Sequence, residues 1–98
     1  MVRHVVMWRV KESHNKTDDI QKLKEALEGL PNKIKEIVDF EVGIDFSNKP
    51  EASADIVLIS TFNSSEDLQV YQEHPAHQEV VKIIRSLTSE RRLVDYNF

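Results

Sequence analysis

The segment Val38-Asp39-Phe40-Glu41-Val42-Gly43-Ile44-Asp45-Phe46 has the clearest pattern in this chain, because apolar and polar residues alternate along it. Successive side chains of a β-strand point to opposite faces, so this period of two predicts a strand with one buried and one acidic face. The polar residues 47–51 predict a loop. A further strand is expected from Asp55 to Phe62, where Ile56-Val57-Leu58-Ile59 is continuously apolar. Such a run is typical of a strand covered on both faces.

Toward the amino end, we expect a first strand at about residues 2–11 and then a helix. Alternation in the first strand places one set of side chains on a single face: Val2, His4, Val6, Trp8 and Val10. Thr17 is the expected N-cap of the helix, since Ser, Thr, Asp and Asn are preferred there. Its apolar stripe recurs at helical spacing: Ile20, Leu23, Leu27 and Leu30. Gly29 and Pro31 predict the end of this helix near Leu30.

Toward the carboxyl end, Ser64 with Asp67 three residues later predicts the start of another helix. Tyr71 shares the inward face of this helix, and Pro75 breaks it. A second helical stretch follows, with inward positions at His77, Val80 or Val81, Ile84 and Leu87. The chain is expected to close with a short strand, residues 92–98. The predicted order is therefore βαββαβ.

The length of 98 residues predicts one domain, residues 1–98, with one core. A chain this short buries a limited share of its surface, and oligomerisation is a common way to add stability. Helices can cover only one face of the sheet in a two-layer domain. The apolar run Ile56–Ile59 therefore predicts that a second copy covers the other face, which makes the protein a homodimer.

Composition excludes several functional classes. Cysteine is absent, which removes disulfides, thiolate nucleophiles and cysteine-based zinc sites and fits a cytoplasmic protein. The net charge of −4 disfavours nucleic-acid binding, and no apolar stretch is long enough to span a membrane. Two glycines cannot form a glycine-rich phosphate loop. We expect no cofactor and no metal, because His74 and His77 lie on either side of a proline break without a carboxylate at ligand spacing.

Three segments together resemble the stress-responsive A/B barrel (Dabb) family: His4–Lys11, the Tyr71–His77 segment with its His-Pro-Ala-His sequence, and Val94-Asp95-Tyr96. The resemblance covers nearly the whole chain. It implies an α+β fold, a ferredoxin-like βαββαβ sandwich with an antiparallel sheet. It also implies that two subunits join their sheets into a dimeric α/β barrel, with a pocket between sheet and helices in each subunit.

The resemblance also implies site residues, with Tyr71 and His77 as the catalytic pair. His4, Val6 and Trp8, on one face of the first strand, are the expected substrate-binding residues. The pair is distantly similar to that of olivetolic acid cyclase, a plant enzyme that closes a polyketide without metal or cofactor. Residues 86–89 lack the aromatic side chain that lines the pocket of that enzyme, so the chain is not predicted to be a polyketide cyclase.

Three functions remain open at this stage. The first is cofactor-free acid/base chemistry on, or binding of, a small carbonyl or phenolic compound, since a base and a donor are what proton abstraction beside a carbonyl requires. The second is a non-enzymatic stress-response protein, in which Tyr71 and His77 only bond each other or a backbone carbonyl at the Pro75 turn. The third is a cofactor-free monooxygenase or haem-degrading relative on the same barrel.

Overall fold

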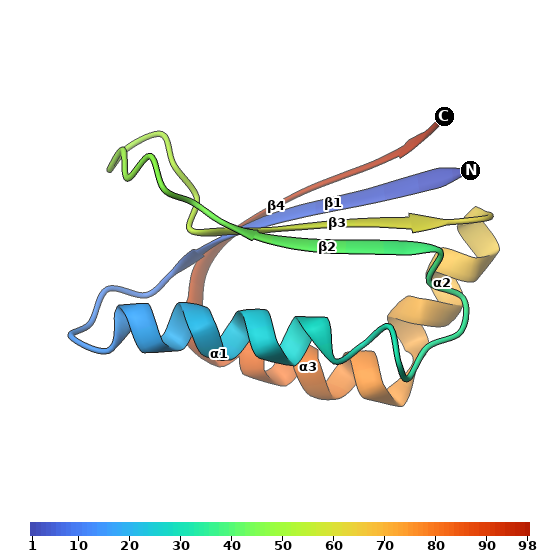
Figure 1. Cartoon of the computed structure of the whole chain (residues 1–98), viewed down its shortest axis with the longest axis horizontal. Helices are drawn as coiled ribbons and strands as arrows, with labels where there is room; N and C mark the ends of the chain where they lie inside the picture. Colours follow the sequence, from blue (N-terminus) through green and yellow to red (C-terminus); the bar gives the residue numbers. More distant parts are fainter.

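Four antiparallel strands form one sheet, and all three helices lie on one side of it (Figure 1). The computed structural model describes residues 1–98. In chain order the elements are β1 (Val2–Val10), α1 (Lys16–Glu28), β2 (Asp39–Ile44), β3 (Ile56–Phe62), α2 (Ser65–Glu73), α3 (Pro75–Leu87) and β4 (Thr88–Asn97). The strand order is β2-β3-β1-β4. This is the predicted ferredoxin-like α+β fold, with the last helical region divided at Pro75.

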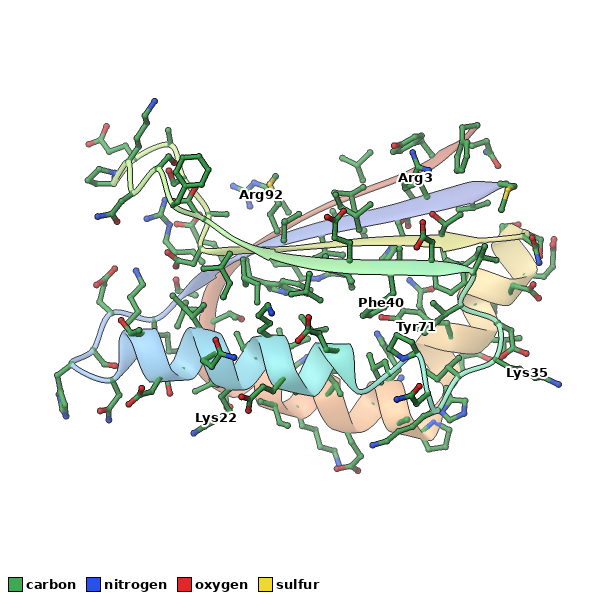
Figure 2. All side chains as sticks on the ribbon, in the orientation of Figure 1. Arg3, Lys22, Lys35, Phe40, Tyr71 and Arg92 are labelled. Carbon is green, nitrogen blue, oxygen red and sulfur yellow. The ribbon has the colours of Figure 1, made fainter.

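The hydrophobic core lies between the helices and one face of the sheet. The inward positions of β1 meet the stripe of α1, and these side chains are almost fully buried: Val6, Trp8, Val10, Leu23 and Leu27. Burying a Val or Leu side chain contributes about 1.5–3 kcal/mol, so this layer is the main source of stability. Figure 2 shows Phe40 and Tyr71 pointing into the same layer.

The opposite face of the sheet has no helix over it, although its centre is apolar. Pairing of β1 with β3 places Val5 beside Ile59 and Met7 beside Val57 on this face. Val5, Val57 and Ile59 are half-buried, and Met7 is 43% exposed. The apolar run of β3 therefore places apolar side chains on both sides of the sheet, as predicted.

Three element boundaries differ most from the sequence prediction. Strand β2, at the edge of the sheet, ends at Ile44, so Phe46 lies beyond the strand and is 97% exposed instead of buried. Helix α1 begins at Lys16, after Asn15, so Thr17 lies inside the first turn and is not the N-cap. The Nζ of Lys16 pairs with Glu12 at 2.6 Å and with Asp55 at 3.4 Å, which ties the start of the helix to the residue that precedes β3. Strand β4 begins at Thr88, four residues before the predicted start. Its first residues are polar, but their backbone pairs with β1, and an exposed edge strand needs no apolar alternation.

The start of α2 matches the prediction. The Ser64 hydroxyl accepts a hydrogen bond of 3.1 Å from the backbone N–H of Asp67. Such a cap contributes about 1 kcal/mol to stability. None of the three helices has the length and apolar character needed to cross a membrane.

Candidate functional site

A cavity of about 350 Å³ opens between the sheet and the helices. This volume is at the small end of the range of about 300–1,000 Å³ typical of ligand pockets. Half of its lining is hydrophobic. The lining residues come from β1, β3, β4 and all three helices: His4, Trp8, Leu27, Leu58, Tyr71, Gln72, His77, Gln78, Val81, Ile84, Arg85 and Arg91.

Tyr71 lies at the centre of this region, on the last turns of α2, and is 1% exposed. Its hydroxyl makes no hydrogen bond to protein, and burial raises the pKa of Tyr71 well above its ordinary value of 10.0. The indole N–H of Trp8 is the only side-chain polar atom that is both sealed from solvent and unpartnered. The Tyr71 hydroxyl therefore reaches the cavity space. It stays protonated near neutral pH and can donate a hydrogen bond there.

His77 lies in the first turn of α3, half-buried, across the proline break from Tyr71. Its Nδ1 lies 3.0 Å from the Gln72 carbonyl oxygen. A carbonyl only accepts, so Nδ1 carries the proton and Nε2 is the acceptor nitrogen. Burial lowers the pKa of His77 below its ordinary 6.5; the Gln72 carbonyl opposes this, while the charges of His4 and Arg91 add to it. Near neutral pH the ring is therefore neutral, and its Nε2 is free to accept a proton.

Pro75 explains how these two side chains meet. His74 before it is extended, and its Nδ1 accepts a 3.0 Å hydrogen bond from the Ala76 N–H, which caps α3. The resulting turn brings the rings of Tyr71 and His77 to a centroid distance of 4.5 Å, tilted by 53°. The rings pack without a hydrogen bond between them. Of the two structural roles considered from sequence, only the bond of His77 to a backbone carbonyl is present.

His4 forms the wall of the cavity on β1 and is 3% exposed. Its Nδ1 lies 2.5 Å from an Asp95 carboxylate oxygen, and the two residues face each other across β1 and β4. The bond to Asp95 thus fixes the orientation of the His4 ring and engages its Nδ1, so Nε2 is the nitrogen that is left for other contacts. The ring centroid of His4 is 6.1 Å from that of Tyr71, in an edge-to-face arrangement.

The expected site residues are brought together with one exception. Tyr71, His77, His4 and Trp8 all line the cavity, whereas Val6 is 1% exposed within the core and does not line it. No three His, Asp or Glu side chains are grouped so that they could hold a metal ion.

Sequence reasoning assigned no role to several residues at the site: Gln72, Gln78, Arg85, Arg91 and Asp95. In the sequence, Asp95 belongs to the family segment Val94-Asp95-Tyr96, and no pattern there indicates a site residue. The pairing of β4 with β1 is what places Asp95 opposite His4, and this pairing depends on a strand register that the sequence does not show. The same register places Arg91 beside Trp8.

Comparison with known proteins identifies relatives over the full length. The family model described as "Stress responsive A/B Barrel Domain" matches residues 2–98. An uncharacterised protein of Streptomyces coelicolor is 29% identical over 100 residues, covering 100% of both chains.

Solved structures show the same fold. A dimeric protein of unknown function from Bacteroides fragilis, described as ferredoxin-like, has a TM-score of 0.87 at 33% identity, covering 99% of this chain and 95% of that one. A hydroxynitrile lyase from Passiflora edulis has a TM-score of 0.72 at 22% identity, covering 97% and 90%. The second likeness concerns the fold alone.

Proposed function

This chain belongs to the stress-responsive A/B barrel family, and from that premise we propose that its cavity performs cofactor-free acid/base chemistry on a small carbonyl or phenolic compound. Tyr71 is the hydrogen-bond donor, and His77 is the base. His4, oriented by Asp95, is a polar wall beside them.

The proposed reaction is proton removal from a carbon next to a carbonyl group. The carbonyl oxygen of the substrate accepts a hydrogen bond from the Tyr71 hydroxyl, and Nε2 of His77 takes the proton from the carbon. The electron pair of the broken C–H bond moves to the carbonyl oxygen, where the Tyr71 donor stabilises the enolate. The enolate then takes a proton back or attacks a second carbonyl group, so the step needs no redox partner.

The observation that carries this proposal is the Tyr71 hydroxyl. A sealed polar group needs a partner within the protein, whereas a polar group that reaches a cavity can bond a ligand there. Here a residue that is 1% exposed has a hydroxyl without a protein partner, next to a histidine whose Nδ1 is held by the Gln72 carbonyl.

We propose that the active form is a homodimer, joined through the helix-free face of the sheet. The relative from Bacteroides fragilis is described as dimeric. On this face, apolar side chains lie exposed or half-buried beside a hollow of about 370 Å³ lined by Met7, Gly43, Ile44, Asp45, Phe46, Ala54, Ile56 and Val57. Phe46 is 97% exposed. Burying such a surface against a second copy is favourable.

Exchange of the methyl protons of acetophenone for deuterium, followed by NMR in D₂O, tests the proposed reaction. We expect catalysis by the wild type. Tyr71→Phe and His77→Asn should each slow it about 100-fold, as is typical for loss of an acid or base. Asn can still donate to the Gln72 carbonyl, so the turn is kept while the base is removed. Tyr96→Phe, which removes a hydroxyl on the helix-free face, is the matched control and should retain full activity.

Melting temperatures of the same variants separate this proposal from a structural role. Tyr71→Phe leaves no protein group unpaired, so its melting temperature should stay within a few degrees of wild type. Equal exchange rates in all four proteins, or a clear loss of stability in Tyr71→Phe, would reject the proposed function and favour the non-enzymatic alternative.

A further inference from the structure

Two arginines at the cavity have no partner for their side chains. Arg85 on α3 and Arg91 on β4 both line it, both are exposed, and no ion pair or hydrogen bond involves either guanidinium. The other arginines are engaged. Arg3 stacks on an aromatic ring at 4.1 Å, Arg9 donates to two backbone carbonyls, and Arg92 donates to a third.

No carboxylate lines the cavity to balance these two charges. Glu90 precedes Arg91 but faces the other side of the sheet, where it pairs with Arg9 at 3.8 Å. Asp95 shares the face of Arg91, but His4 occupies its carboxylate. The cavity is thus lined by positive charge in a chain whose net charge is −4. Such a local field concentrates anions.

We propose that the ligand of this cavity is a small organic carboxylate, with its anionic end held by Arg85 and Arg91. This inference rests on the proposed function and specifies its substrate class: the carbonyl or phenol lies at Tyr71, and the carboxylate lies toward solvent. The planar guanidinium group binds a carboxylate through two parallel hydrogen bonds. Between the two ends, the walls are apolar and suit a flat hydrocarbon body: Trp8, Leu27, Leu58, Val81 and Ile84.

A bound carboxylate also acts on the proposed base. The charge of Arg91 contributes to lowering the pKa of His77, and an anion beside Arg91 offsets that charge. Nε2 of His77 therefore becomes a stronger base when an anionic ligand is present. A neutral compound with the same body but no carboxylate does not have this effect on His77.

The test compares 4-acetylbenzoate with its methyl ester, which share the acetophenone group and differ in charge. Binding is measured by NMR titration, and methyl-proton exchange in D₂O is measured on the same samples. We expect the wild type to bind the acid at least about tenfold more tightly than the ester, as expected for hydrogen bonds to charged groups. The double variant Arg85→Gln/Arg91→Gln should lose that preference and keep its affinity for the ester.

The double variant Lys22→Gln/Lys82→Gln is the matched control, because it removes two positive charges outside the cavity. Lys22 projects from α1 away from the sheet in Figure 2, and the Lys82 side chain on α3 is 74% exposed. This control should keep the preference for the acid. An equal loss of the preference for the acid in both double variants would show a general effect of charge and overturn the inference.

The outcomes also separate this inference from the proposed function. If acid and ester bind equally to the wild type, and exchange of both depends on Tyr71, the anion site is wrong and the acid/base site stands. If the double arginine variant loses its preference for binding the acid while Tyr71→Phe changes no exchange rate, the anion site stands and the proposed reaction fails. Absence of saturable binding of both probes counts against both.

Discussion

The two faces of the sheet are built from the same strands but are completed in different ways. On the helix side, α1, α2 and α3 cover the strands, and the remaining space is a cavity lined by apolar side chains together with His4, Tyr71 and His77. On the other side, apolar residues such as Val57 and Ile59 are left half-buried by the chain itself. The comparison shows that the chain covers one face of its sheet with its own helices and leaves apolar side chains of the other face uncovered, where we propose that a second copy packs.

Charge follows the same division. On the helix-free face, Arg3 and Arg9 are engaged with protein groups. At the cavity, Arg85 and Arg91 are free. The two arginines without a partner therefore lie at the cavity, and Arg3 and Arg9 are engaged on the face where we propose that a second subunit packs.

The largest effect is expected from a charge placed on the helix-free face. Ile59→Asp would bury an unpaired carboxylate in the proposed interface, so the dimer should be lost at micromolar concentration. Val70→Asp, at a 45% exposed position on α2, is the control and should remain dimeric. Sedimentation equilibrium measures both. A wild-type protein that sediments as a folded monomer would remove the proposed dimer and leave the apolar face unexplained.

A smaller and more selective effect comes from two neighbouring valines of β1 on opposite faces. Val6→Ala removes methyl groups from a fully buried site and should lower the free energy of unfolding by about 2 kcal/mol. Val5→Ala, at a half-buried site, should cost less than about 1 kcal/mol in unfolding but weaken the dimer. Urea denaturation and sedimentation on the same samples separate these quantities. If Val6→Ala and Val5→Ala lower the free energy of unfolding equally and neither changes dimerisation, the assignment of the two faces is contradicted.

The smallest effect concerns the protonation of His77. Its pKa in the folded state lies below 6.5, so the unfolded chain binds more protons in the acidic range. Stability from this group is fully present above 6.5 and declines as pH falls toward the folded pKa. His77→Asn should therefore lose less stability than the wild type on acidification from pH ~7.5 to ~5.5, measured by urea denaturation. A steeper loss in the variant would mean that the protonated ring is stabilised in the fold.

Much of the fold follows from sequence because its signals are local. The alternation around β2, the cap at Ser64 and the break at Pro75 each act within a few residues, and the structure confirms the strand, the cap and the break. The buried face predicted for 38–46 is only partly right, because Phe40 and Val42 are half-buried while Val38, Ile44 and Phe46 are exposed. The extent of β4 was underestimated, because residues 88–91 are polar and join the sheet only through backbone pairing with β1. Thr17 was misassigned as a cap, because distant Asp55 helps to position the start of α1.

The site was only partly predictable for a related reason. Tyr71 and His77 are six residues apart on either side of the break at Pro75, so a local turn that the sequence indicates brings them together. The bond between His4 and Asp95 and the position of Arg91 beside Trp8 join the two ends of the chain. Both depend on strand register, which nothing in a single sequence specifies. Their role in binding stays a prediction, as does the role of Val6, which the structure places in the core.

The central claim is that His77 presents a free, unprotonated Nε2 to the cavity beside the Tyr71 hydroxyl. Nitrogen-15 NMR of the histidine rings tests it most directly, because the two imidazole nitrogens have distinct shifts in each tautomer. We predict that at neutral pH His77 carries its proton on Nδ1, that its pKa lies below 6.5, and that its Nε2 signal moves when 4-acetylbenzoate is added. A proton on Nε2, or an Nε2 signal that does not respond at saturating ligand, would contradict it.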